Sequence, residues 1–149
     1  MKLDKITLEL LHQKLRACTE EMALALSHAA RSTYVKDAAD FGTALADLNG
    51  KFFAYPGKLG VSGFLDLDCG AAIAAVTAHG PLVPGDVIIT NHPYASGGLA
   101  THMPDLQLIQ PYFHDGRIIC YGWDFIHSAD IGGGVPSSIS PSFTTIFQE

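Results

Sequence analysis

Histidine and aspartate residues gather in the last third of this 149-residue chain, and they repeat one short spacing. His102 precedes Asp105 by three residues, and the same interval separates His127 from Asp130. Neutral imidazole nitrogens and carboxylate oxygens are ligands that zinc, manganese and iron(II) take in proteins. Gly-rich and Pro-rich loops around both pairs allow side chains from separate elements to converge. Two His-x-x-Asp pairs therefore indicate a metal site, although a single pair often occurs by chance.

His127 admits a second interpretation, because it ends an aromatic strand face. Aromatic residues alternate with small or polar ones in the segment before it, so they share one face of a strand with His127. They are Tyr121, Trp123 and Phe125. A histidine at such a position is often a core residue satisfied by one hydrogen bond. Asp130, beyond the predicted end of the strand, favours the ligand role instead.

Composition limits the classes of protein to consider. Nine Lys and Arg stand against fifteen Asp and Glu, for a net charge of −6, which argues against nucleic acid as a partner. Charged residues are only 16% of the chain, against about 25% in typical domains, so we expect part of the surface to be covered by another chain. Three cysteines without a Cys-x-x-Cys pair predict buried thiols in a reducing cytoplasm. The longest apolar run, 71–78, is far shorter than the ~20 residues that cross a bilayer, so no membrane contact is expected.

A long amphipathic helix is predicted near the N-terminus. Apolar residues recur there at alternating steps of three and four, which places them along one helix face. They are Leu8, Leu11, Leu15, Cys18, Met22, Ala25 and Ala29. Thr7 is the expected N-cap, and the polar face opposite the apolar stripe is expected to meet solvent.

Two antiparallel hairpins and a second helix are predicted after it. The first hairpin turns at Leu48-Asn49-Gly50, because an Asn-Gly pair favours the left-handed dihedrals of a tight turn. The predicted strands cover 41–47, 51–55, 86–90, 106–113 and 117–126, and the second helix covers 67–78. Helices and antiparallel hairpins without repeats indicate an α+β domain, with the metal site on loops at strand ends.

Several short motifs follow one another along the chain. They are Asp-Phe at 40–41, Pro-Gly-Asp-Val-Ile at 84–88, Asn-His-Pro-Tyr at 91–94, Thr-His-Met-Pro-Asp at 101–105 and His-Ser-Ala-Asp-Ile-Gly-Gly at 127–133. In this order they closely resemble the N-terminal part of the hydantoinase B family. That family includes the B subunits of ATP-dependent hydantoinases, the matching half of 5-oxoprolinase, caprolactamase, and the large subunits of acetone and acetophenone carboxylases. The resemblance covers nearly the whole chain.

The resemblance implies a division of labour between two subunits. A hydantoinase A-like partner uses ATP to phosphorylate the substrate, and the B-type subunit holds a divalent metal (Zn, Mn or Fe) near the activated lactam or ketone. The metal ligands that it implies here are Asp40, His102, His127 and Asp130. It assigns no catalytic residue, and it implies a hetero-oligomer.

Two positions beside these ligands depart from the family pattern, which reads Asn-Asp-Pro-Tyr and His-His-Ala-Asp. His92 and Ser128 stand at the differing positions of this chain. Together with Asp105 they are candidates to surround and orient the ligands. Asp105 is either the acceptor that orients His102 or a turn residue after Pro104. Lactam and ketone enzymes are expected to differ at residues beside the metal. These two departures therefore leave both a lactam and a ketone as possible substrates.

The chain is also much shorter than family subunits. We expect residues 1–149 to form the N-terminal metal-binding region of a hydantoinase B-like subunit, either a fragment or a truncated subunit, inactive alone. The Gly-rich loop 131–135 could cradle a phosphoryl group, but the sequence has no Gly-x-x-x-x-Gly-Lys-Ser/Thr motif. We therefore expect the partner subunit to use ATP. Three functions remain: a part of a cyclic-amide hydrolase, the same part of a ketone carboxylase, or a non-catalytic assembly domain.

Overall fold

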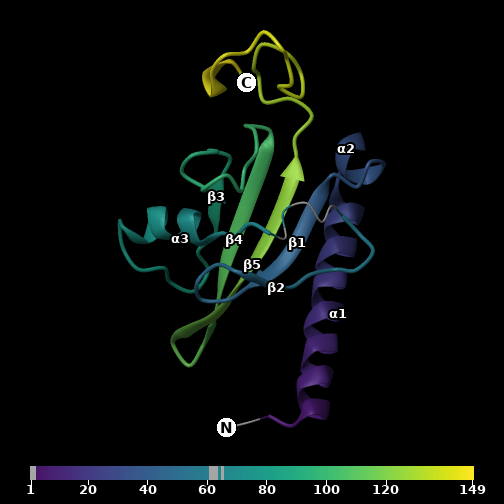
Figure 1. Cartoon of the computed structure of the whole chain (residues 1–149), viewed down its shortest axis with the longest axis vertical. Coiled ribbons are helices and arrows are strands. Elements are labelled where there is room, and N and C mark those ends of the chain that lie inside the picture. The colour runs from purple at the N-terminus through teal and green to yellow at the C-terminus, as the bar shows by residue number, and fades with distance from the viewer. Residues whose placement is uncertain (1–2, 61–63, 65) are drawn as a thin grey trace.

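A five-stranded antiparallel sheet with strand order β2-β1-β5-β4-β3 forms the centre of the protein. The computed structural model describes residues 3–60, 64 and 66–149, and Figure 1 shows the sheet with α1 along one side. The elements are α1 (Lys5–Ala29), α2 (Thr33–Lys36), β1 (Phe41–Ala46), β2 (Phe52–Ala54), α3 (Gly70–Thr77), β3 (Ile88–Thr90), β4 (Asp105–His114), β5 (Arg117–His127) and a 3-10 turn, η1 (Ile146–Gln148). The predicted α+β class is therefore confirmed. Within the described ranges, no helix has the length and apolar character that a membrane span requires.

The hairpin of β4 and β5 supplies most of the core. Buried positions alternate along β4, and β5 buries Tyr121, Trp123, Phe125 and His127, which is the face that the period of two predicts. α3 packs against this face and forms one apolar cluster with Trp123 and Phe125. The indole N–H of Trp123 donates to the Gln107 side-chain oxygen at 2.9 Å. This bond satisfies a buried donor and ties the two strands together.

The first hairpin turns where the Asn-Gly pair predicts. The Asp47 carboxylate accepts hydrogen bonds from the N–H groups of Asn49 and Lys51, and Gly50 has a φ of 86°. A Cβ at Gly50 would collide with the backbone of Gly70 at the start of α3. Glycine is therefore required both by the dihedral and by the close approach of α3.

Two predicted elements, α3 and β3, begin three and two residues later than expected, because a carboxylate accepts a hydrogen bond within the preceding turn. The α3 helix starts at Gly70, whose N–H donates to the side chain of Asp68 at 2.9 Å. The β3 strand starts at Ile88, because the Asp86 carboxylate accepts from the N–H of Val83 at 2.8 Å and keeps that segment in a turn. Side-chain bonds to nearby backbone compete with regular structure in this way.

The predicted N-terminal helix forms as α1, but its cap and its buried face differ from the prediction. Asp4 is the N-cap, and Thr7 lies within the first turn and donates to Asp4 through its N–H and its hydroxyl. The residues that α1 buries are Thr19 and Ala23. They lie against β1, where the Thr43 hydroxyl donates to the carbonyl of Thr19 at 3.1 Å. Both are small, so the helix backbone lies close to the sheet.

The predicted apolar stripe of α1 lies beside this contact instead of within it. Leu8 is 59% exposed, Leu11 is 42% exposed, and Cys18 is exposed as well. At about 100° per residue, the stripe is turned roughly a quarter of a turn from the face that meets the sheet. The prediction of buried thiols is therefore wrong for Cys18, and Cys120 is only half-buried. Cys69 is buried, and burial raises the pKa of its thiol to about 12.

Asp124 is a polar exception on the side of β5 that faces α1. Its Oδ1 is buried and has no hydrogen-bond partner among the residues that the structure describes. Burial raises the pKa of this carboxyl from 3.8 to about 6. Between these values the folded protein binds a proton that the unfolded chain releases, so the free energy of unfolding falls as the pH rises through that range.

We expect Asp124→Asn to stabilise the protein at pH 8 by on the order of 1 to 3 kcal/mol, because the amide removes a buried unpaired charge. Urea unfolding of wild type and variant at pH 4, 6 and 8 measures this, and the gain should shrink toward pH 4, where Asp124 is protonated. Asp37→Asn, at an exposed position, is the matched control and should show no such trend. A gain that is equal at all three pH values would contradict the assignment to Asp124.

Candidate metal centre

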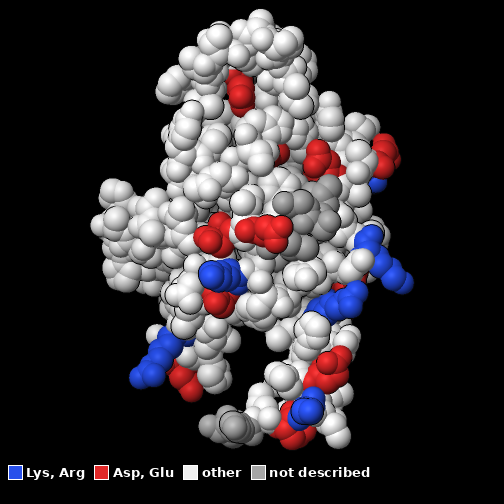
Figure 2. Space-filling view, in the orientation of Figure 1, with Lys and Arg blue, Asp and Glu red and all other residues white. Residues whose placement is uncertain are grey.

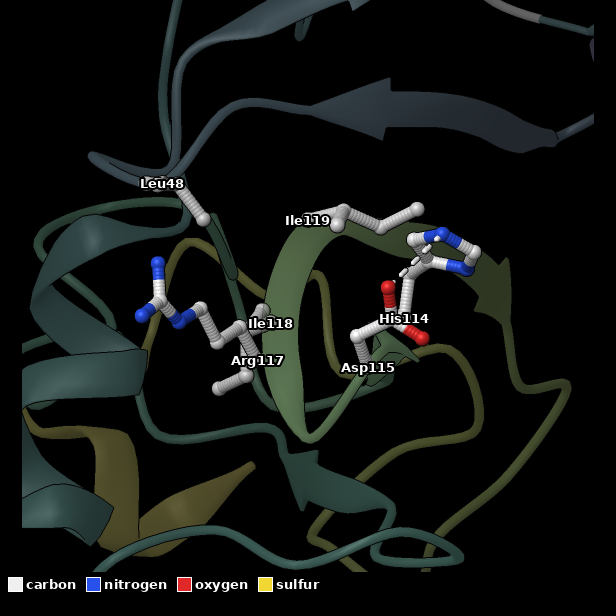
Figure 3. A pocket seen from close by; sticks show the side chains of 6 residues that line it. All are labelled: Leu48, His114, Asp115, Arg117, Ile118 and Ile119. Carbon is white, nitrogen blue, oxygen red and sulfur yellow. Dashed lines mark ion pairs between the residues drawn. The ribbon is translucent and has the colours of Figure 1, made fainter.

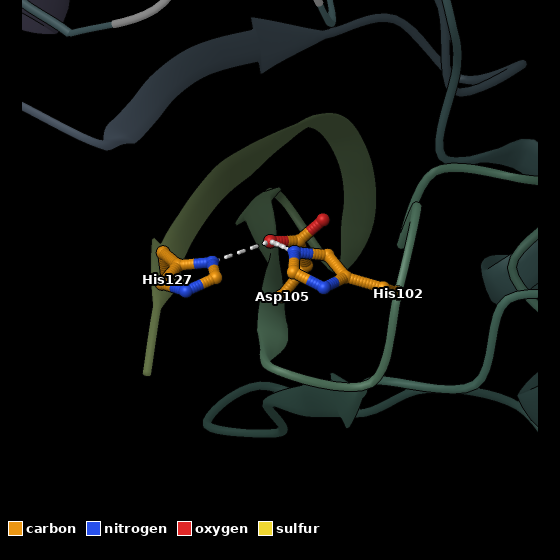
Figure 4. Close-up of side chains that lie close together, drawn as sticks. All are labelled: His102, Asp105 and His127. Carbon is orange, nitrogen blue, oxygen red and sulfur yellow. Dashed lines mark hydrogen bonds and ion pairs between the residues drawn. The ribbon is translucent and has the colours of Figure 1, made fainter. Parts of the chain in front are cut away.

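Two histidines and one aspartate converge at the end of β4 and β5 nearest the C-terminal loop. Asp105 begins β4 and pairs directly with His127, the last residue of β5. His102 lies in the loop before β4, and Figure 4 shows its ring and that of His127 on either side of the Asp105 carboxylate. Asp105 is 3% exposed and His127 is 4% exposed. One ligand atom from each of the three residues lies within 4.8 Å of the others.

The Asp105 carboxylate stands at the centre of this cluster. Its Oδ1 lies 3.2 Å from His102 Nε2 and 3.4 Å from His127 Nδ1. Its Oδ2 accepts hydrogen bonds from the N–H and the hydroxyl of Thr101, at 3.2 and 2.6 Å. Thr101 therefore fixes the carboxylate with Oδ1 turned toward both imidazoles. A buried carboxylate needs such partners to offset the loss of water.

Two serines hold the outer nitrogens of the histidine rings. His102 Nδ1 lies 2.8 Å from Ser138 Oγ, and His127 Nε2 lies 3.0 Å from Ser137 Oγ. The φ angles of Ser137 and Ser138 are 66° and 60°, in the left-handed region that non-glycine residues rarely adopt. Backbone of this kind persists only where its surroundings hold it. The loop thus orients both rings so that their inner nitrogens face Asp105.

This donor set fits a divalent metal. Histidines that bind metal usually use one ring nitrogen for the ion and bond the other to a protein oxygen, which fixes the tautomer. His102 and His127 both have this arrangement, because a serine occupies the outer nitrogen of each. Two imidazoles and one carboxylate form a set that binds iron(II) or zinc and leaves positions for water or substrate.

Asp40 and Asp130, both predicted as ligands, lie differently with respect to the cluster. Asp40 Oδ2 is 3.9 Å from His127 Nδ1, and the Asp40 carbonyl accepts from the N–H of His127 at 3.2 Å. Asp40 is therefore at the edge of the cluster. Asp130 is exposed, and its Oδ1 accepts from the N–H of Gly132 at 2.8 Å. The carboxylate between the two imidazoles belongs to Asp105, which the sequence offered only as an orienting or turn residue.

His92 and Ser128 lie outside the group of converging ligand atoms. His92 is exposed, and its Nδ1 accepts from the N–H of Ala95 at 3.2 Å. The Ser128 hydroxyl donates to the carbonyl of Asp130 at 3.3 Å. Both side chains are therefore occupied by local backbone contacts.

Several residues of the cluster were not identified from the sequence. Tyr34 packs against His127 with ring centroids 4.8 Å apart, and Ser137 and Ser138 reach ring nitrogens that lie 10 and 36 residues away in the chain. No local spacing connects residues over such separations. The spacing of Thr101 and Asp105 could have suggested their contact, because a threonine four residues before a buried aspartate can donate a hydrogen bond to it.

Two open pockets lie at opposite ends of the β4–β5 hairpin. A pocket of about 410 Å³ opens beside His102 and Ser138, with Phe143 and Glu149 in its wall. The other, of about 610 Å³, lies at the hairpin tip, where Figure 3 shows exposed side chains such as His114 around it. Of these two pockets, the first adjoins the converging ligand atoms at His102, so it is the candidate site for a substrate.

Comparison with known proteins identifies the family of this chain. Residues 4–149 match the hydantoinase B/oxoprolinase family. The chain is 35% identical over 150 residues to 5-oxoprolinase of Saccharomyces cerevisiae, covering 100% of this chain and 11% of that enzyme. It superposes on the ATP-dependent caprolactamase from Pseudomonas jessenii with a TM-score of 0.74 and 27% identity, covering 100% of this chain and 25% of the other.

A nucleotide-free acetone carboxylase has the same fold, with a TM-score of 0.73, 20% identity, and coverage of 87% of this chain and 17% of the other. This chain thus spans about a tenth to a quarter of the lengths of these proteins. The family match nevertheless includes every residue of the cluster described above. This protein therefore belongs to the hydantoinase B/oxoprolinase family.

Proposed function

We propose that this chain is the metal-bearing part of an ATP-dependent enzyme that hydrolyses cyclic amides. The observation that carries the proposal is the convergence of His102, Asp105 and His127 at the ends of two paired strands. The names of the relatives support the substrate class, because 5-oxoproline and caprolactam are both lactams. The acetone carboxylase shares only the fold with this chain at 20% identity, so a ketone substrate has less support.

The residues of the centre would divide into ligands and positioning groups. His102 Nε2, His127 Nδ1 and Asp105 Oδ1 are the proposed ligands, and Asp40 is near enough to join them. Asp130 is still a predicted ligand, but its carboxylate would first have to give up its hydrogen bond from the N–H of Gly132. Residues His102, Asp105 and His127 would hold a divalent ion, which when bound would lower the pKa of its water toward ~7 and polarise a carbonyl oxygen.

Activation of the substrate is assigned to another subunit. An unactivated lactam is a poor electrophile, and phosphorylation of its oxygen requires bound ATP. The sequence has no Gly-x-x-x-x-Gly-Lys-Ser/Thr motif with which to hold the phosphates. We therefore propose a hydantoinase A-like ATPase as partner, in a cytoplasmic hetero-oligomer.

We expect the purified chain to bind about one divalent ion, and His127→Ala or Asp105→Asn to lower the affinity at least ~10-fold, because each removes a ligand. Elemental analysis after dialysis against buffered metal measures the occupancy. His92→Ala removes an exposed imidazole outside the cluster and is the matched control. Asp130→Asn, compared with Asp105→Asn, decides which carboxylate binds. If wild type and His127→Ala both contained equal and negligible amounts of metal, the proposed metal site would be refuted. The assembly-domain alternative would then remain.

The metal should dissociate as the pH falls through ~6.5 to ~5, because histidine ligands must be neutral to bind and protons compete for them in this range. Occupancy measured at steps between pH 8 and pH 4 follows the loss, and circular dichroism at each step verifies that the chain stays folded. Full occupancy at pH 4 would be inconsistent with imidazole ligands.

The chain alone should hydrolyse no lactam, with or without ATP, because ATP-dependent activation is assigned to a partner subunit. The assay measures ATP-dependent turnover of hydantoin, 5-oxoproline, caprolactam and acetophenone, first by the chain and then with a hydantoinase A-like subunit and the remainder of a B-type subunit. Turnover by the isolated chain would refute the subunit assignment. Carboxylation of acetophenone by the complex, without lactam hydrolysis, would favour the carboxylase instead.

A further inference from the structure

One face of the sheet is only partly covered. α1 packs over β1 and β2, whereas the residues of β4 on that face, Leu106, Leu108, Gln110 and Tyr112, are all partly or fully accessible. A groove of about 690 Å³ runs between α1 and the β4–β5 hairpin. Its apolar lining includes Cys18, Met22 and Ala25 of α1 and Tyr112, Ile119 and Cys120 of the hairpin. A largely apolar groove of this kind marks a surface on which another structural element can pack.

The N-terminal half of α1 extends beyond the sheet. Residues 8–14 are all exposed, and Figures 1 and 2 show this half standing clear of the hairpin at the end of the molecule opposite to the C-terminus. Leu8, Leu10 and Leu11 are 59%, 58% and 42% exposed there. A helix of this length gains little stability in water without packing. Within residues 3–60, 64 and 66–149, the leucines of the projecting half are therefore left accessible to solvent.

The stripe of α1 has the spacing of a two-helix seam. The steps between its members, 8, 11, 15, 18, 22, 25 and 29, alternate between three and four without exception. A strict repeat of seven keeps an apolar seam facing one partner helix. The stripe runs from the projecting half into the groove, where Cys18, Met22 and Ala25 form one wall. The occupant that fits is thus a helix with the same repeat.

We propose that a second copy of this chain packs its α1 antiparallel against this stripe. The heptad register then places Leu8 opposite Ala25, Leu11 opposite Met22, and Leu15 opposite Cys18 of the partner subunit. Each leucine faces a smaller or more flexible side chain, so the layers fill without collision.

The charges beside the seam are complementary in the same register. Lys14 and Glu21 occupy corresponding positions on the flank of the stripe. In the antiparallel pair, Lys14 of one copy lies opposite Glu21 of the partner subunit, and the twofold axis repeats the pair. Parallel pairing would place Lys14 near Thr19 and Glu21 near Leu26, with no opposite charges. The charge pattern therefore favours the antiparallel arrangement.

The position of the sheet along α1 leaves room for this pairing. α1 meets its own sheet through Thr19 and Ala23, in its C-terminal half. An antiparallel partner therefore places its own sheet beside the projecting half, at the other end of the helix pair. The projecting leucines of each copy then lie in the groove of the other. Both unpartnered surfaces are covered by one symmetric contact.

We expect the wild-type chain to sediment as a dimer, and Leu11→Glu to raise its dissociation constant at least ~100-fold, because the twofold axis buries two unpaired charges. Leu10→Glu is the matched control, since Leu10 is exposed, even more than Leu11, but lies off the stripe, and this variant should stay dimeric. Circular dichroism of both variants verifies that they fold. A monomeric wild type, or equal effects of the two variants, would overturn the proposal and leave the groove to a different subunit.

The antiparallel register has its own tests. Lys14→Glu and Glu21→Lys should each weaken the dimer by about tenfold through two repulsive pairs, and the double variant should restore it. In a Cys120→Ala background, Leu15→Cys should form a disulfide with Cys18 of the partner subunit on oxidation, whereas Ala17→Cys, on another side of the helix, should not. Efficient cross-linking of wild type through Cys18 alone would indicate parallel helices and refute this register.

Discussion

The pairing of β4 with β5 is the constraint on which the rest of the structure depends. It places Asp105 opposite His127 and Ile109 opposite Trp123, so one register determines both the ligand cluster and the core. A shift by one residue would turn Trp123 and Phe125 toward the other face of the sheet. The bond between the Trp123 indole and Gln107 opposes such a shift from within the core. The chemistry and the stability of this domain therefore share one set of backbone hydrogen bonds.

The two faces of the sheet differ in how completely they are filled. On one face α3 and the loop at Leu99 close over the aromatic residues of β5. On the other, α1 touches β1 through two small residues and leaves beside it the apolar hairpin and an Asp124 oxygen that has no hydrogen-bond partner in the described part of the chain. Burying an unpaired carboxylate is unfavourable, so the second face is the poorer core. The accessible apolar residues of β4 on this face make it suitable as an interface. Low overall charge agrees with this assignment.

Local patterns predicted most of the fold, and interactions distant in sequence account for the differences. Period-two alternation and an Asn-Gly turn are local, so both hairpins and the buried face with His127 were predictable. The apolar period of α1 predicts which apolar residues share one face of the helix, but it does not predict which face packs against the sheet. Two small residues, Thr19 and Ala23, make that contact. Asp105 stands between the imidazoles because of strand register. Ser137 and Ser138 reach the rings through a loop that carries no comparable pattern.

The loop that holds the histidine rings also implies an order of assembly. Asp105 and His127 meet as soon as the β4–β5 hairpin closes, whereas the bond from His102 to Ser138 joins residues 36 apart and that from Met103 to Glu149 joins residues 46 apart. Contacts between near neighbours in a chain form faster than those that must close long loops. The imidazoles and the carboxylate therefore come together before Ser138 and Glu149 close the rest of the loop, whereas the bond from His127 to Ser137 spans only 10 residues and forms early. In kinetic terms, closure of this loop is the last step of folding, and until that step the candidate metal centre would be open to an entering ion.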